Sequence, residues 1–287
     1  MRQKNVPTSR QNRRLSGCRP SASDAGVHKK REVGIPTERK RASARNLKLE
    51  IEYDGTNYAG WQVQNSNKTI QSVIEKTLQR ILQEKVHLIV SGRTDSGTHA
   101  LAQVANFKTK SKIPPDKLRL ALNSWLPADI AISKAEEKAL DFHSRFDAKS
   151  KIYRYSILNR PHPSPLQRKA VYFYRHPLNV SLMRKESKVL LGRHNFKSFQ
   201  AVDKTERNPV RTIKNIRITV DNGLVCIDIE AGGFLYNMVR NIAGTLIEIG
   251  RGRFKPGDLK RILLGRDRRL AGPTVPARGL CLMKVNY

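Results

Sequence analysis

One short loop of the sequence holds the residue types best suited to chemistry. Residues 91–100 read Ser-Gly-Arg-Thr-Asp-Ser-Gly-Thr-His-Ala, and two glycines give the backbone freedom around Arg93 and Asp95. The segment lies between two predicted strands, and loops on a rigid scaffold are where catalytic residues concentrate. The competing interpretation is an ordinary turn, in which the Asp95 carboxylate accepts hydrogen bonds from nearby backbone N–H groups. The loop alone leaves both interpretations open.

The chain lacks the common motifs for nucleotide, nicotinamide and zinc chemistry. It contains no G-x-x-x-x-G-K-[ST] phosphate loop, no G-x-G-x-x-G dinucleotide turn and no H-E-x-x-H zinc helix. Its cysteines, Cys18, Cys226 and Cys281, are far apart and form no C-x-x-C pair, which fits a reducing compartment. A two-metal nuclease needs several converging carboxylates, and the loop offers only Asp95. We therefore expect no metal and no cofactor.

Two tyrosines and one arginine are further candidates. Tyr153 and Tyr155 lie two residues apart on a predicted strand, so they share one face with Ile157. Arg240 falls in a helical pattern over residues 236–249, whose apolar residues lie on one side. On pattern alone, Arg240 is a surface residue with its apolar stem lying along the protein, and Tyr155 is a core residue.

The hydrophobic patterns predict an α+β fold in two similar halves, residues 47–145 and 146–287. Alternation over residues 47–53 predicts a strand, and the spacing over residues 70–82 predicts a helix with Thr69 as its N-cap. Further strands are predicted at 86–90, 102–107, 130–135, 151–158, 213–220, 224–230 and 280–285, and further helices at 116–126, 181–191 and 236–249. Strands with a period of two indicate largely antiparallel sheets, with helices on one face. We expect the other face to be an open, basic surface that suits a structured RNA.

The charge balance indicates a nucleic-acid partner. Lys and Arg total 55 against 24 Asp and Glu, a net charge of +31, and such a chain attracts polyanions. Residues 1–46 hold thirteen of the basic and three of the acidic residues, and their composition predicts a disordered basic arm. An organelle transit peptide is the alternative interpretation of this arm. No stretch approaches the roughly 18 apolar residues of a membrane span, so we expect a cytoplasmic protein.

Several blocks of the sequence resemble the TruA family of transfer RNA pseudouridine synthases. Residues 92–100 are similar to the family's G-R-T-D-x-G-V-H-A motif, with Thr98 in place of the usual valine. The other matching blocks, in the family's order, are Tyr53-Asp54-Gly55, Gly60-Trp61-Gln62, Phe142-His143-x-Arg145-Phe146, Tyr153-Arg154-Tyr155 and Phe234-Leu235-x-x-Met238-Val239-Arg240-Asn241-Ile242. The resemblance covers nearly all of residues 47–287, whereas typical bacterial members lack the basic arm.

The resemblance implies roles for four residues. Asp95 matches the family's nucleophile in an isomerisation that detaches uracil from C1′ of the ribose and rejoins it through C5. Arg240 matches the arginine that keeps this carboxylate ionised through a two-pronged pair. Arg93 matches the side chain that enters the space left by the flipped base, although a phosphate contact is the alternative. Tyr153 matches the tyrosine on which the flipped uracil stacks.

The resemblance also implies a substrate and an assembly. The substrate is the anticodon arm of transfer RNA, at positions 38 to 40, and the family works as a homodimer in which one RNA touches both subunits. The sequence does not give the order of the bond-making steps. The alternative function is that of a non-catalytic RNA-binding or tRNA-chaperone protein on the same fold, and the presence of Asp95, Tyr153 and Arg240 argues against it.

Overall fold

The computed structural model describes residues 44–64, 67–202 and 208–287. The chain divides into residues 1–41 and a compact unit of residues 42–287, and the fold given below is that of the second unit. Except for its last three residues, the predicted basic arm of residues 1–46 lies outside the described part of the chain.

Strands and helices alternate along the described chain much as the hydrophobic patterns predict. The strands are β1 (Arg45–Tyr53), β2 (Ile89–Val90), β3 (His99–Thr109), β4 (Ile130–Lys138), β5 (Ser150–Leu158), β6 (Tyr172–Phe173), β7 (Gly192–Asn195), β8 (Val210–Asp221), β9 (Leu224–Ala231) and β10 (Leu280–Asn286). The helices are α1 (Ile70–Leu82), α2 (Pro115–Trp125), α3 (Val180–Ser187), α4 (Met238–Gly250) and α5 (Asp258–Gly265). Thr69 caps α1 as predicted, because its hydroxyl accepts a hydrogen bond from the Ser72 N–H.

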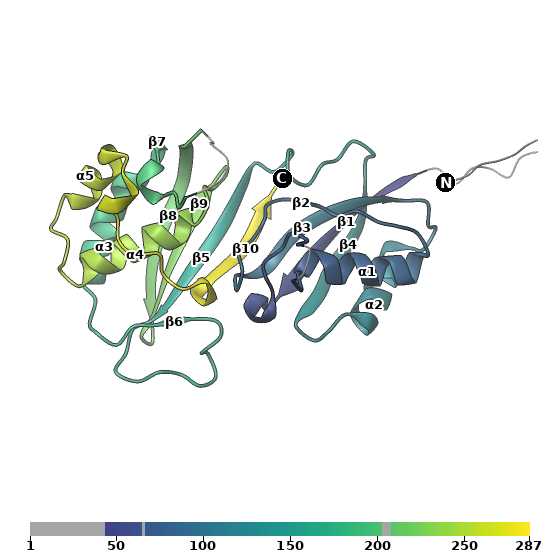
Figure 1. The fold of residues 1–287 in the computed structure, drawn as a ribbon, viewed down its shortest axis with the longest axis horizontal. Coiled ribbons are helices and arrows are strands. Elements are labelled where there is room, and N and C mark those ends of the chain that lie inside the picture. The colour runs from purple at the N-terminus through teal and green to yellow at the C-terminus, as the bar shows by residue number, and fades with distance from the viewer. Residues whose placement is uncertain (1–43, 65–66, 203–207) are drawn as a thin grey trace, which may run out of the picture. The chain divides into compact units, whose positions relative to one another are not determined.

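All the strands belong to one continuous sheet. Its main order is β4-β1-β3-β10-β5-β9-β8-β7, with β2 on β3 and β6 on β5. The pairs are antiparallel except for β10 with β3 and β5 with β6. The last strand, β10, therefore lies between β3 of the first half and β5 of the second (Figure 1). The expected α+β class with a largely antiparallel sheet is confirmed, and the boundary after residue 145 stays a prediction.

One face of this sheet is buried from end to end. Tyr53 is in register with Ala100, Ala100 with Leu282, Leu282 with Tyr153, and Tyr153 with Ile229, so these five buried side chains share a face. The buried residues of α1 to α5 belong to the same hydrophobic cluster. The helices therefore cover the face on which Tyr153 lies.

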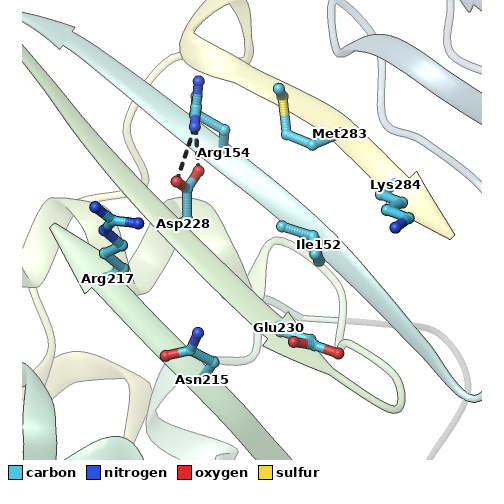
Figure 2. A pocket seen from close by; sticks show the side chains of 8 residues that line it. All are labelled: Ile152, Arg154, Asn215, Arg217, Asp228, Glu230, Met283 and Lys284. Carbon is cyan, nitrogen blue, oxygen red and sulfur yellow. Dashed lines mark hydrogen bonds and ion pairs between the residues drawn. The ribbon is translucent and has the colours of Figure 1, made fainter. Parts of the chain in front are cut away.

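The opposite face carries charged side chains that pair with one another. Arg154, Asp228 and Arg217 lie side by side across β5, β9 and β8, and Figure 2 shows them with their neighbours. Arg154 donates two hydrogen bonds to Asp228, of 2.7 and 2.9 Å. Acidic residues thus offset part of the basic charge on this open face.

No helix of the described residues is long and apolar enough to cross a membrane.

Candidate active site

The loop between β2 and β3 is fixed to the sheet at its beginning. The Ser91 N–H donates to the Val104 carbonyl, and the Ser91 hydroxyl donates to the Gln103 side chain at 2.7 Å. The Gln103 amide in turn donates to the Gly92 carbonyl at 2.8 Å. Gln103 is fully buried, so these bonds are shielded from water and hold the start of the loop firmly.

The segment around Gly60 and Trp61 packs against the middle of the loop. The Trp61 N–H donates to the Thr94 carbonyl at 3.1 Å, and the Tyr53 and Thr94 hydroxyls lie 2.7 Å apart. Gly60 has a φ of +85°, and a Cβ atom there would lie 2.6 Å from the Thr94 oxygen. Only glycine meets both conditions, which explains its place in the Gly60-Trp61-Gln62 block.

The backbone around Asp95 forms the predicted turn, yet the Asp95 side chain takes no part in it. The Thr98 N–H donates to the Asp95 carbonyl at 3.1 Å, and Gly97 has a φ of +75°. Within the described residues, no N–H or hydroxyl group donates a hydrogen bond to the Asp95 carboxylate. The carboxylate is therefore not used to stabilise the turn and remains open to a ligand.

Burial and one cation act on Asp95 in opposite directions. Its side chain is 27% exposed, and the Arg240 Nη1 atom lies 3.9 Å from its Oδ2 atom. Burial raises the pKa of Asp95 above its ordinary value, and the positive charge of Arg240 partly offsets this rise. The result is a partly desolvated carboxylate that has a single cationic neighbour.

Arg240 is held in place by groups other than Asp95. Its Nε atom donates to the Val275 carbonyl at 2.7 Å, and its Nη1 atom donates to the Asn237 side chain at 2.8 Å. This geometry differs from the two-pronged pair that the family resemblance implies, because two donors of the guanidinium already have other acceptors. Arg240 is nevertheless 17% exposed and faces Asp95, so it is not the surface residue that the helical pattern alone suggests.

Tyr153 lies on the buried face next to these two residues. It is 7% exposed, and its ring packs edge-on against Phe234, with 5.0 Å between the ring centroids. Burial raises the pKa of Tyr153, and the negative charge of Asp95 contributes to the rise. Its hydroxyl has no hydrogen-bond partner among the described residues. Tyr155, in contrast, is fully buried and donates to the Pro276 carbonyl, as expected of a core residue.

Arg93 is the most exposed of the predicted site residues. Its side chain makes no ion pair or hydrogen bond within the part of the chain that the structure describes. The structure thus brings Asp95 and Arg240 together with Tyr153 on the same face, and it leaves Arg93 exposed on the loop two residues before Asp95.

Two neighbours of the site were not singled out by the sequence analysis. His99 follows the loop, and its ring nitrogens lie 3.1 Å from an Asp54 carboxylate oxygen and 2.8 Å from the Lys169 carbonyl, which joins three segments. Lys151 precedes Tyr153 by two residues and faces the same side of β5. In the sequence, the alternation over the predicted strand 151–158 places Lys151 on the core side, where a lysine is unusual. This was the signal that could have identified it.

The described residues hold no group of three or more His, Cys, Asp or Glu side chains that could bind a metal ion. The expected independence from metals and cofactors stays a prediction.

Comparisons with known proteins identify the family. Residues 50–147 and 187–287 match the family model described as tRNA pseudouridine synthase. The tRNA pseudouridine synthase A 2 of Clostridium tetani (strain Massachusetts / E88) is 51% identical over 246 residues, which cover 85% of this chain and 99% of that protein. The tRNA pseudouridine synthase A of Clostridium acetobutylicum is 49% identical over 243 residues, which cover 85% of this chain and 100% of that protein.

Among solved structures, the archaeal box H/ACA sRNP Nop10-Cbf5 complex aligns with 78% of this chain and 59% of its own, at 13% identity and a TM-score of 0.31. So distant a likeness carries no argument here. The family model spans most of the chain, and the curated relatives match almost end to end. The protein is therefore an isomerase that forms pseudouridine in tRNA, and the chain belongs to the TruA-type tRNA pseudouridine synthase family.

Proposed function

We propose that this enzyme isomerises uridines at positions 38 to 40 of the tRNA anticodon arm, with Asp95 as the nucleophile. One observation carries the proposal: a partly buried carboxylate, held by a fixed loop, has a single cation beside it and no hydrogen bond to its own turn. A carboxylate in that state is available to attack an electrophilic carbon.

The chemistry is an exchange of one bond for another. The bond from N1 of uracil to C1′ breaks, a bond from C5 to C1′ forms, the C5 proton leaves, and N1 gains a proton. The base must turn while it remains in the site, so it needs a flat surface on which to stack. The Tyr153 ring, held edge-on by Phe234, provides such a surface.

Each neighbour of Asp95 has a role in this proposal. Arg240 keeps a useful fraction of the carboxylate ionised despite its burial. A uridine cannot react within the base stack, so the nucleotide must flip out, and the exposed Arg93 side chain enters the space it leaves. The reaction is an isomerisation without net redox change, so the proposal assigns no step to a metal or cofactor.

The assembly and location follow from the same resemblance. We infer a homodimer in which one tRNA touches both subunits, and a cytoplasmic enzyme. Analytical ultracentrifugation of the full chain, with and without tRNA, measures the first, and a tagged chain imaged in its own cells measures the second.

The Asp95→Asn variant tests the nucleophile. We expect pseudouridine formation in an unmodified tRNA transcript to fall by a factor on the order of 10⁴ or more, with tRNA affinity within a few-fold of wild type. The measurement is position-resolved pseudouridine detection under single-turnover conditions. Asp221→Asn is the matched control, because Asp221 is exposed at the turn between β8 and β9.

Thermal unfolding separates this result from misfolding. Because the folded pKa of Asp95 is raised, its favourable contribution to stability is present below the unfolded pKa and is lost as pH rises through the folded pKa. At neutral pH the Asn variant should therefore unfold at an equal or higher temperature than wild type. Turnover near the wild-type rate would remove Asp95 from the mechanism.

A further inference from the structure

Lys151 is a cation on the buried face of the sheet. It lies on β5 in register with Ala231 and Val285, both of which are buried, and it is itself 8% exposed. Its neighbour on the same face of β5 is Tyr153, two residues further along. Lysine is almost never this buried without a partner, so its presence at a core position needs a reason.

The Lys151 side chain lies against the start of the catalytic loop. A Cβ atom built on Gly92 would lie 3.2 Å from the Lys151 Cε atom and 3.9 Å from its Nζ atom. The absence of a side chain at Gly92 thus leaves the room that the lysine occupies. This contact places the Lys151 ammonium beside the loop that carries Asp95.

No acidic group balances the Lys151 charge within the described residues. Lys151 makes no ion pair and no hydrogen bond there, and the only charge that acts on it clearly is the guanidinium of Arg145. Burial, and to a lesser extent Arg145, lower the pKa of Lys151 below its ordinary value. In the described residues, the fully buried side-chain N and O atoms that lack a hydrogen-bond partner belong to Trp61, Thr98 and Gln200. The Lys151 Nζ atom also lacks a partner but is not fully buried, so it keeps an opening to solvent.

The charge that acts on Lys151 most clearly is positive. This charge belongs to Arg145, whose side chain is exposed. Desolvating an ammonium group beside another cation is costly, and a bound anion would offset that cost. A neutral carbonyl of uracil does not compensate two positive charges, whereas a phosphodiester group is anionic and accepts hydrogen bonds from both cations.

We propose that Lys151, with Arg145 beside it, binds the phosphodiester group that flanks the reacting uridine of the tRNA. Gly92 and Asp95 are three residues apart, which spans at most about 10 Å. A phosphate held at Lys151 therefore fixes the ribose of the adjoining nucleotide beside Asp95. The inference rests on the proposed function, because it takes the Asp95 pocket as the place where the uridine reacts.

The test combines a change in the protein with a change in the RNA. The tRNA is assembled by ligation with a neutral methylphosphonate linkage on the 5′ or the 3′ side of the target uridine, and kcat/KM is measured for wild type and Lys151→Met. For one of the two linkages, we expect the neutral group to lower kcat/KM about 10-fold in wild type and less than about 2-fold in Lys151→Met. Equal losses in both proteins at both linkages would overturn the proposal.

Stability distinguishes a binding role from a structural one. Because Met removes a desolvated, unpaired charge and keeps much of the chain length, Lys151→Met should unfold at an equal or higher temperature than wild type while kcat/KM for the natural tRNA falls about 10-fold. Lys151→Gln, which is less apolar, should show the same kinetic loss. A lower unfolding temperature together with unchanged sensitivity to the neutral linkage would assign Lys151 to packing alone.

A control variant lies on the other side of the sheet. Lys284 is exposed on β10 and belongs to the open face, where Figure 2 shows it near Ile152. Lys284→Met removes the same charge and should leave the response to both neutral linkages as in wild type. The two proposals fail separately. An active Asp95→Asn enzyme in which Lys151→Met still reduces the effect of the neutral linkage contradicts only the nucleophile. If Asp95 is required but Lys151→Met and the neutral linkage lower kcat/KM additively, only the phosphate site is contradicted.

Discussion

At the scale of single residues, the protonation of Asp95 is set by a balance between its burial and Arg240. Burial favours the neutral acid, and the guanidinium 3.9 Å away favours the carboxylate. A nucleophilic role requires the carboxylate, so the reaction depends on the weaker of these two influences. Arg240 itself is positioned by Val275 and Asn237, which means that its charge and its geometry can be tested separately.

Two variants of Arg240 separate charge from geometry. Arg240→Gln removes the charge, so the pKa of Asp95 should rise further and the acid limb of the kcat/KM profile should move to higher pH. Arg240→Lys keeps the charge but replaces the two separate nitrogens that donate to Val275 and Asn237 by a single ammonium nitrogen, so kcat should fall about 10-fold or more while the acid limb moves less. The measurement is the pH dependence of kcat and kcat/KM on one tRNA.

Arg217→Lys is the matched control, because Arg217 is exposed on the open face. It should leave both the rate and the pH profile unchanged. If Arg240→Gln had the wild-type acid limb, the ion pair with Asp95 would have no influence on catalysis.

At the scale of elements, two glycines allow α4 to pack closely against the segment that precedes β10. A Cβ atom on Gly244 would lie 1.9 Å from the Pro273 carbonyl oxygen, and one on Gly272 would lie 2.7 Å from the Thr245 Cα atom. Backbone therefore packs directly on backbone, and the same segment presents the Val275 carbonyl to Arg240. The close approach of these two elements sets where the Arg240 guanidinium lies.

Gly244→Ala should disturb both the fold and the site. The added methyl group must push residues 272–275 away from α4, which we expect to cost about 1–3 kcal/mol of unfolding free energy. Because the Val275 carbonyl moves with that segment, kcat should fall as well. The measurements are denaturant unfolding and turnover at a temperature where the variant is fully folded.

Gly232→Ala is the control for this change. A Cβ atom on Gly232 would meet its nearest neighbour at 3.8 Å, an ordinary contact, so stability and turnover should stay close to wild type. A Gly244→Ala protein with wild-type stability would show that α4 and the 272–275 segment separate without cost.

At the scale of the whole molecule, positive charge is distributed over the chain and not confined to one segment. Residues 1–43 hold twelve Lys or Arg, yet the remainder of the chain is basic as well. The described residues also show where a truncation must stop, because Arg45 belongs to β1 and donates to Glu137 and to the Ser111 and Ile113 carbonyls. A deletion through residue 46 would remove these interactions.

Deleting residues 1–43 should lower tRNA affinity without changing which uridines are modified. The segment offers many cations but little aromatic surface with which to read a base. For each phosphate that the shortened chain no longer neutralises, the slope of log affinity against log salt should become shallower by about 0.7 to 0.9. The truncated and full chains are compared by binding at several salt concentrations, on cognate and noncognate tRNA, and by mapping the modified positions. A shifted uridine preference would show that the arm takes part in recognition.

Local pattern was sufficient to predict much of the sheet but not all of the elements. The strand of β1 and the helix α1 with its Thr69 cap were predicted within two residues, because alternation and capping are properties of neighbouring residues. The predicted strand at 86–90 is only Ile89–Val90, and α5 was not predicted at all. α5 is short, and it is stabilised by burying Leu259, Ile262 and Leu263 against the rest of the core, which no local pattern reveals.

The sequence by itself determined that Asp95 sits in a glycine-flanked loop between two strands, and that the chain carries enough positive charge to bind RNA. Only the tertiary structure decided which residues meet there. Arg240 and Tyr153 reach Asp95 because β10 pairs with both β3 and β5 and so joins the two halves of the sheet. Lys151 is a candidate phosphate-binding residue only in the folded structure, where its strand directs the side chain toward Gly92 and no acidic group of the described residues pairs with it. These contacts depend on strand pairing between distant segments, which is selected by packing of the whole core and not by local propensity.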